Sequence, residues 1–193
     1  MKQLFIKENQ TNNQRMTVRD DRGQILYLIE GRWGRKDDMV TLQALNSDQF
    51  LRAKQNKLSP LPIFDLCTQD EKLGVIRKHP GLFGIRDSYF TVHPYEWVIT
   101  GDFEELYFTA HHKNELIMEC EKIHMNRCDY FEVLVENEED VPLCALITVL
   151  LDHYSRKKQE EQQMDFVEER TYHLGFSNNI QASTTLKKEK VMQ

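Results

Sequence analysis

Residues 141–151 read VPLCALITVLL, an apolar run with no polar face at helical spacing. A helix that is hydrophobic on every side has to be buried on every side. Crossing a bilayer takes about 20 apolar residues, so this run is too short to span a membrane. Because the segments before it are typical of β-strands, we predict a helix enclosed by a closed β structure.

Those preceding segments repeat a strand–turn–strand pattern. Asp21-Arg22-Gly23 is a typical hairpin turn, and Phe131 and Val133 alternate with Glu132 as expected for a strand with one buried face. The predicted strands are residues 15–20, 24–30, 39–45, 49–55, 61–67, 73–78, 85–93, 96–100, 106–110, 115–121 and 130–136. An open sheet of this size would leave long free edges. We therefore predict a mainly β fold, a closed antiparallel barrel of about twelve strands around a central hydrophobic helix.

The chain divides by composition into two parts. We expect residues 1–156 to form the barrel with its central helix at 139–155, and residues 157–193 to form a charged C-terminal extension, partly helical or disordered. Asp140 is the expected N-cap, with Pro142 in the first helical turn. The helix becomes polar at Asp152 and His153, where we expect it to leave the barrel. Apolar residues in the extension predict docking onto the barrel or self-association: Phe166, Val167, Tyr172 and Leu174.

The net charge of −6 belongs to the barrel part, because residues 157–193 contain six basic and six acidic side chains. An acidic body disfavours non-specific binding to nucleic acid. The first residues, MKQLFIKENQ, have no signal-peptide pattern, and the four cysteines are widely spaced. These features predict a cytoplasmic protein with reduced thiols that is not an integral membrane protein.

The order of elements resembles the LURP-one-related family, whose tubby-like fold is shared with tubby proteins and phospholipid scramblases. The resemblance rests on the opening strands, the 21–23 turn, the loop 31–37, Gly101-Asp102-Phe103, the run 129–133 and the helix 141–152. It covers about residues 1–156. The resemblance implies a twelve-stranded barrel around a hydrophobic helix, and it implies no catalytic residues.

The loop of residues 31–37 is the first candidate ligand-binding surface. Arg32, Arg35 and Lys36 surround Trp33, and such a loop could bind a lipid phosphate at a membrane surface. Its Gly31 and Gly34 spacing also resembles a nucleic-acid clamp, although the helices of such a domain are absent. The alternative is that Trp33 packs on the barrel while the charges are solvated.

A second basic surface is predicted from two neighbouring segments of the chain. Its members are Arg52, Lys54, Lys57, Arg77 and Lys78. Arg52 and Lys54 share one face of their strand, where charge is also what a solvated outer face would show.

Metal binding and catalysis have weaker sequence support. Cys120, His124 and Cys128 are spaced four apart, but the first faces the core of its strand, so we predict no metal site and no cofactor. Asp102, Glu104 and Glu105 are interpreted as the end of a hairpin rather than as catalytic carboxylates. No nucleotide-binding, nucleophile-elbow or metalloprotease motif is present. An enzyme would instead need convergent histidines, for which the candidates are His93, His111, His112 and His124.

The sequence therefore predicts a non-catalytic barrel module. Its partner is an unknown protein or a small ligand, bound on surface loops or at a rim because the helix fills the interior. The first alternative is a lipid-binding protein that recognises an anionic lipid head group of the phosphoinositide type. The second alternative is an enzyme whose site carries no recognised motif.

Overall fold

The computed structural model describes residues 1–7, 15–32, 38–45, 47, 49–56, 61–69, 71–81, 88–125 and 127–155. The chain divides into two units, Met1–His153 and Tyr154–Gln193. The first unit is the barrel. The extension predicted at residues 157–193 lies outside the described residues.

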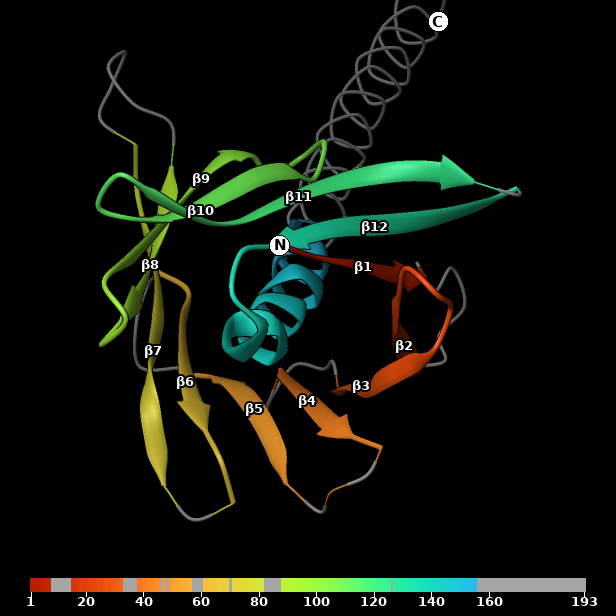
Figure 1. Cartoon of the computed structure of the whole chain (residues 1–193). Helices are drawn as coiled ribbons and strands as arrows, with labels where there is room; N and C mark the ends of the chain where they lie inside the picture. Colours follow the sequence, from red (N-terminus) through yellow and green to blue (C-terminus); the bar gives the residue numbers. More distant parts are fainter. Residues whose placement is uncertain are drawn as a thin grey trace, which may run out of the picture. The chain divides into compact units, whose positions relative to one another are not determined.

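Twelve strands form the barrel in the described chain. They are β1 (Lys2–Lys7), β2 (Arg15–Asp20), β3 (Ile25–Arg32), β4 (Met39–Ala44), β5 (Phe50–Gln55), β6 (Ile63–Cys67), β7 (Lys72–His79), β8 (Tyr89–His93), β9 (Trp97–Asp102), β10 (Tyr107–His112), β11 (Glu115–Met125) and β12 (Cys128–Val135). Each strand pairs antiparallel with its sequence neighbours, and β1 closes the ring against β12 (Figure 1). The predicted closed antiparallel barrel is confirmed.

The closing strand β1 is absent from the strands predicted by the hairpin pattern. Its residues pair with β12 along the whole length from Lys2 to Lys7, and Leu4 and Ile6 are completely buried. On its other side, residues 4–6 pair with β2. Only two inward-facing side chains mark this strand, and Phe5 between them is apolar as well, so the segment shows no clear alternation of apolar and polar residues.

The strands bury the side chains that their alternation predicts. In β12, Phe131, Val133 and Val135 have no exposed surface, and in β11 the same holds for Met118 and Cys120. A strand needs only every second residue to be apolar when one face is buried. The barrel wall is therefore apolar inside and largely polar outside.

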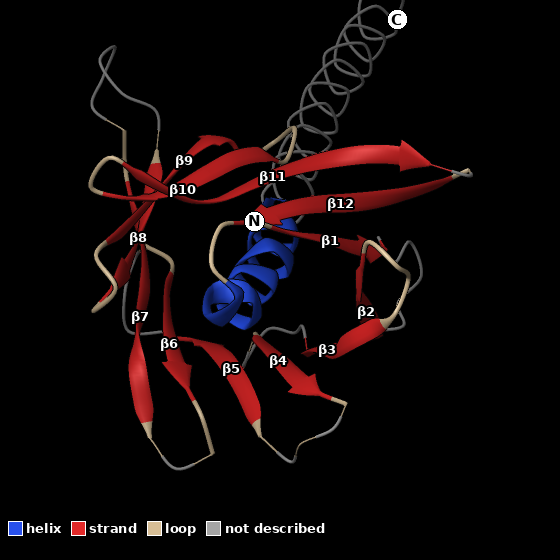
Figure 2. Ribbon diagram, in the orientation of Figure 1, coloured by secondary structure: helices blue, strands red, loops and turns tan. Residues whose placement is uncertain are grey.

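The predicted central helix lies inside the ring of strands (Figure 2). A 3-10 turn, Glu138–Asp140, leads into an α-helix at residues 141–155. Leu146 and Ile147 are completely buried, and Thr148 satisfies its hydroxyl by donating to the Cys144 carbonyl oxygen at 3.0 Å. The helix contributes buried side chains on all sides, as its uniform hydrophobicity predicts.

One expectation for the helix is wrong. Asp152 does not mark the point where the helix leaves the barrel, because this residue is only 2% exposed. It lies one turn after Thr148, which is also buried, so polar side chains continue along a buried face of the helix. The sequence of the helix therefore becomes polar while its side chains are still buried.

The hairpin turns show why particular residues are needed. Asp20 accepts backbone hydrogen bonds from Arg22 and Gln24 at 3.1 and 2.8 Å, and Gly23 has a φ of 77°. Aspartate bonds its own turn in this way, and glycine adopts positive φ without strain. The predicted turn at residues 21–23 is thereby confirmed.

Candidate functional site

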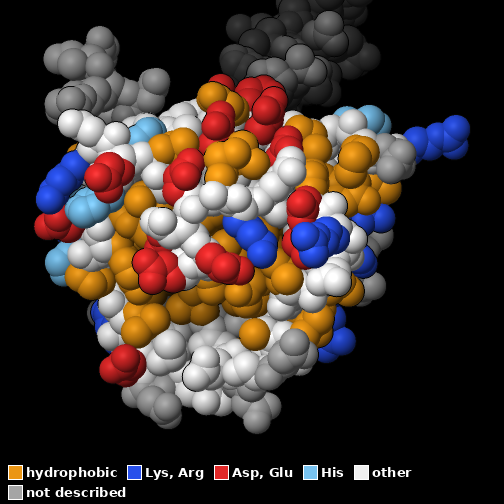
Figure 3. Space-filling view, viewed as in Figure 1, with side chains coloured by type: hydrophobic (Ala, Val, Ile, Leu, Met, Phe, Trp, Pro, Cys, Tyr) orange, Lys and Arg blue, Asp and Glu red, His pale blue; other side chains and the backbone are white. Residues whose placement is uncertain are grey.

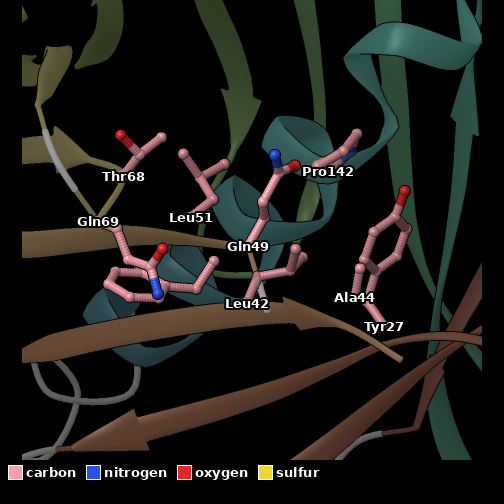
Figure 4. Close-up of a pocket in the computed structure, with 9 residues that line it drawn as sticks. Tyr27, Leu42, Ala44, Gln49, Leu51, Thr68, Gln69 and Pro142 are labelled. Atoms are coloured by element: carbon pink, nitrogen blue, oxygen red, sulfur yellow. The ribbon is translucent and has the colours of Figure 1, made fainter. Parts of the chain in front are cut away.

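A pocket opens at the end of the barrel where the helix begins (Figure 4). Its cavity volume is about 490 Å³. We call it the rim pocket. It is lined by Tyr27, Leu42, Ala44, Gln49, Phe50, Leu51, Thr68, Gln69 and Pro142. These residues come from β3, β4 and β5, from the segments that flank β5 and β6, and from the first turn of the helix.

The pocket forms because the barrel wall extends past the start of the helix. Tyr27 pairs with Ala44 across β3 and β4, and Leu42 pairs with Leu51 across β4 and β5. Further along the same inner face, Ile29, Val40 and Ala53 are buried. The inward side chains near the strand ends therefore border open space beside Pro142.

The polar groups of the rim pocket are neutral. Figure 4 places Tyr27 on one side and Thr68 and Gln69 on the other, with Gln49 and Pro142 between them. No lining residue carries a formal charge at neutral pH. Such a lining can bury apolar groups and offers hydroxyl and amide groups for hydrogen bonds.

Burial and a nearby carboxylate both disfavour ionisation of the Tyr27 hydroxyl. Burial raises the pKa of Tyr27 above its ordinary value of 10.0, and the negative charge of Glu138 raises it further, while Lys2 acts in the opposite direction. The Lys2 Nζ lies 3.2 Å from the Glu138 Oε1, and the Glu138 side chain is 84% exposed. Tyr27 can therefore donate a hydrogen bond across the physiological pH range.

Arg52 lies beside the pocket without lining it. Its guanidinium is 4.5 Å from the centre of the Phe50 ring, and its Nε donates to the Thr41 Oγ1 at 3.4 Å. Arg52 and Lys54 lie on the outer face of β5, because the intervening Ala53 is buried inside. The predicted sharing of one face by these two cations is confirmed.

The other members of the predicted second basic surface do not all join Arg52 and Lys54. Asp65 pairs with Lys54 in the sheet and forms an ion pair with Lys72 at 2.6 Å, which places negative charge on that face. Arg77 and Lys78 are consecutive in β7, so their side chains point to opposite faces. Lys57 lies outside the described residues.

The first predicted surface is only partly described. Arg32 is the last residue of β3 and is exposed. Trp33, Arg35 and Lys36 lie outside the described residues. β3 runs away from the rim pocket toward this loop, so Arg32 is at the opposite end of the barrel.

The cysteine and histidine candidates for a metal site lie in different environments. Cys120 faces the core, and burial raises its pKa to about 12. His124 lies near the tip of the β11–β12 hairpin, where its Nδ1 is 2.7 Å from the Asp129 Oδ1. Within the described ranges, no group of three or more His, Cys, Asp and Glu side chains is arranged to hold a metal ion.

The carboxylates considered for catalysis serve a turn. Asp102 accepts hydrogen bonds from the backbone N–H groups of Glu104 and Glu105 at 2.9 and 3.0 Å. This arrangement caps the β9–β10 turn and confirms the predicted hairpin end. The Nε2 of His112 lies 3.4 Å from the Oε2 of Glu96, away from the β9–β10 turn. These polar groups are therefore distributed over separate turns.

The barrel part of the chain matches a known protein family. Residues 2–152 match the family model described as LURP-one-related. The chain belongs to the LURP-one-related family. The match spans the strands and most of the helix, in agreement with the resemblance expected for residues 1–156. Comparisons with curated proteins and with solved structures found no match.

A site at a rim was among the expectations for this LURP-one-related chain, but the residues of the rim pocket were not predicted from the sequence. Tyr27, Leu42 and Leu51 look like ordinary core residues, and Pro142 is noticed only as a helix-start signal. Finding the pocket requires the strand register and the level at which the helix begins.

In the part of the chain that the structure describes, no helix is long and apolar enough to cross a membrane.

A buried polar contact occurs toward the opposite end of the barrel. Asp38 is 5% exposed, and its Oδ2 lies 3.8 Å from the Nε2 of His153 on the helix. The Asp38 carbonyl also accepts a hydrogen bond from the Gln55 N–H at 2.9 Å. These contacts join the helix to the barrel wall, and we assign them a structural role.

Proposed function

We propose that this chain is a non-catalytic binding module that accommodates a small, mainly apolar ligand in the rim pocket. One observation carries the proposal: a cavity of about 490 Å³ lies at the rim and is lined mainly by apolar side chains. Small-molecule sites usually have volumes of roughly 300–1,000 Å³ and combine apolar walls with a few polar groups. The rim pocket has both properties.

The position of the pocket supports binding from solvent. The helix occupies the barrel interior, so an internal site of the kind found in open barrels has no room there. At the rim, Leu42 and Leu51 provide apolar walls beside the first turn of the helix. A ligand entering there removes apolar surface from water, at about 25 cal/mol for each Å².

The non-catalytic part of the proposal rests on the placement of reactive groups. Burial raises the pKa of both Cys120 and Cys144, so neither thiol is an effective nucleophile at neutral pH. Asp102 bonds to its own turn, and His112 and His124 each lie beside a single carboxylate. Catalysis generally needs such groups to converge on one cleft.

The lipid-surface alternative has less support. Asp65 of β6 lies opposite Lys54 of β5 and pairs with Lys72, so acidic charge borders the basic face of β5. Liposome co-sedimentation at two salt concentrations tests the alternative, with anionic and phosphoinositide-containing vesicles and a variant in which Trp33, Arg35 and Lys36 are all alanine. Salt-sensitive binding that this variant loses would favour lipid recognition over the rim pocket.

The direct test of the rim pocket fills it. Ala44→Phe adds a ring on the inner face of β4, and Val98→Phe adds a ring at an exposed position of β9 that does not line the pocket. The probe is the uncharged fluorophore N-phenyl-1-naphthylamine. We expect wild type and Val98→Phe to bind it saturably, and Ala44→Phe to bind it about tenfold more weakly or not at all.

A second variant protects the test against misfolding. Gln49→Trp fills the pocket from an exposed position before β5, where the barrel core is not disturbed. Circular dichroism and urea unfolding confirm that each variant is folded. Equal probe binding by wild type, Ala44→Phe and Gln49→Trp would refute the proposed site.

A further inference from the structure

The two sides of the rim pocket differ in their charged surroundings. On the side of Tyr27, the nearby chain is the acidic turn Glu138–Asp140, which only Val141 separates from Pro142. On the side of Phe50, the Arg52 guanidinium covers the ring from the outer face of β5. A ligand that carries charge is therefore expected to prefer one orientation in the pocket.

Three carboxylates and one cation lie at the turn that leads into the helix. The turn supplies the carboxylates of Glu138, Glu139 and Asp140, and Lys2 pairs with the first of them. Asn137 donates to the Asp140 carboxylate at 3.2 Å, a neutral partner that leaves its charge in place. The turn also offsets the positive end of the helix dipole, so the helix start does not favour an anion here.

Aromatic surface lies next to these carboxylates. The ring of Tyr27 lines the pocket, and its hydroxyl points toward the segment that enters the helix before Pro142 (Figure 4); the Glu138 carboxylate in that segment raises the pKa of Tyr27. A cationic group is attracted both to the face of an aromatic ring and to a nearby carboxylate. The same place repels a phosphate or a carboxylate.

Apolar surface continues away from this place. Leu42, Ala44 and Leu51 line the pocket beside Tyr27 and toward Phe50. Figure 3 shows the same face of the molecule, with hydrophobic side chains gathered below a band of mixed acidic and basic side chains. One side of the pocket thus lies beside charged groups, and the rest of its lining is apolar, so a single ligand can contact both.

We propose that the rim pocket selects amphipathic amines: ligands with an apolar body beside Leu42 and Leu51 and an ammonium head group between Tyr27 and Glu138. This inference rests on the proposed function, since it requires that the pocket binds a ligand. The ammonium displaces Lys2 from Glu138 or shares that carboxylate with it. The Arg52 side of the pocket receives the apolar body, because Arg52 disfavours a second cation near Phe50.

The test compares three ligands that share an octyl chain and differ in the head group. Isothermal titration calorimetry measures the affinities of octyltrimethylammonium, 1-octanol and octanoate for the full chain. We expect the ammonium to bind about three- to tenfold more tightly than the alcohol, and octanoate to bind most weakly. The preference for the ammonium is expected to shrink as salt concentration rises.

Charge variants locate the head group. Glu138→Gln is expected to weaken binding of the ammonium about two- to fivefold and to leave 1-octanol unchanged, because the carboxylate is exposed and partly screened. Lys2→Gln removes the competing cation and is expected to strengthen ammonium binding about twofold. Glu121→Gln, an exposed carboxylate of β11, is the matched control and is expected to change neither ligand.

The outcomes separate this inference from the proposed function. If all three ligands bind equally well and Ala44→Phe abolishes their binding, the pocket binds ligands but the amine selectivity is refuted. If octanoate binds most tightly, the inference is refuted in favour of an anionic ligand. If Glu138→Gln and Glu121→Gln weaken the ammonium equally, the attraction is a general effect of the acidic protein. Failure of every ligand to bind, or binding that Ala44→Phe leaves unchanged, would refute the proposed function itself.

Discussion

The role of the central helix can be tested by shortening one side chain in the barrel core. Leu146 lies in the middle of the helix and has no exposed surface, whereas Leu28 on β3 is 42% exposed. Leu146→Ala and Leu28→Ala delete the same carbon atoms in two environments. Alanine is as good a helix former as leucine, so the helix variant reports on packing rather than on helix propensity.

The expected magnitudes follow from burial. Removing buried methyl and methylene groups costs about 0.8 kcal/mol for each group, and the cavity left behind adds to this, which gives about 3–4 kcal/mol for Leu146→Ala. Leu28→Ala should cost less than about 1 kcal/mol, because much of that side chain already contacts water.

Equilibrium unfolding in urea, followed by far-ultraviolet circular dichroism, measures the free energy of unfolding of wild type and both variants. An unchanged dependence on urea concentration would show that the unfolded states are comparable. If Leu146→Ala lowers the free energy of unfolding by less than about 1 kcal/mol, or by no more than Leu28→Ala does, the helix is not the packed centre of the barrel. A membrane-inserting helix would give that result.

Further predictions concern a glycine and the thiols. Gly101→Ala should destabilise the barrel by about 2 kcal/mol or more, because φ is 144° and the new Cβ would lie 2.4 Å from the Tyr107 carbonyl oxygen. Gly23→Ala is the control in the same urea assay. It should cost only about 1 kcal/mol, because φ is 77° and the space around the new Cβ is open. A thiol reagent at pH 8 should rapidly modify Cys67 and Cys128, which are partly exposed. It should modify the buried Cys120 and Cys144 only upon unfolding. Equal rates at all four would contradict the burial of the last two. Because the pKa of Cys120 is raised from 9.0 to about 12 in the folded state, the stability that this thiol contributes is present below about pH 9 and is lost as pH rises toward 12. Unfolding free energies at pH 8, 10 and 11 should therefore fall less steeply for Cys120→Ala than for wild type, and identical slopes would contradict the raised pKa.

The sequence predicts the fold well because its signals are local. The alternation at Phe131 and Val133 and the turn at Gly23 each depend on neighbouring residues, and the structure confirms them. Strand ends are predicted less well: β11 runs to Met125, beyond the expected end at residue 121. The last residues of that strand are mostly exposed, so no buried face produces an alternating pattern there.

The candidate surfaces show where sequence reasoning is insufficient. Consecutive charges such as Arg77 and Lys78 look like a cluster in the sequence, but a strand directs them to opposite faces. Asp65 lies far from Lys54 in the sequence, yet the register places it directly beside that cation. Charge on a sheet surface is therefore decided by cross-strand neighbours.

The sequence by itself determined that this chain forms an antiparallel barrel around a buried helix, because alternation and uniform hydrophobicity are properties of single segments. Only the tertiary structure decided how the ring closes, since β1 is identified by its two partners. Only the tertiary structure also placed Tyr27, Leu42 and Leu51 at a rim pocket, although their residue types suit an ordinary core. The physical reason is the level at which the helix begins inside the barrel. An inward-facing side chain that meets the helix is core, and the same side chain beyond the end of the helix borders a pocket.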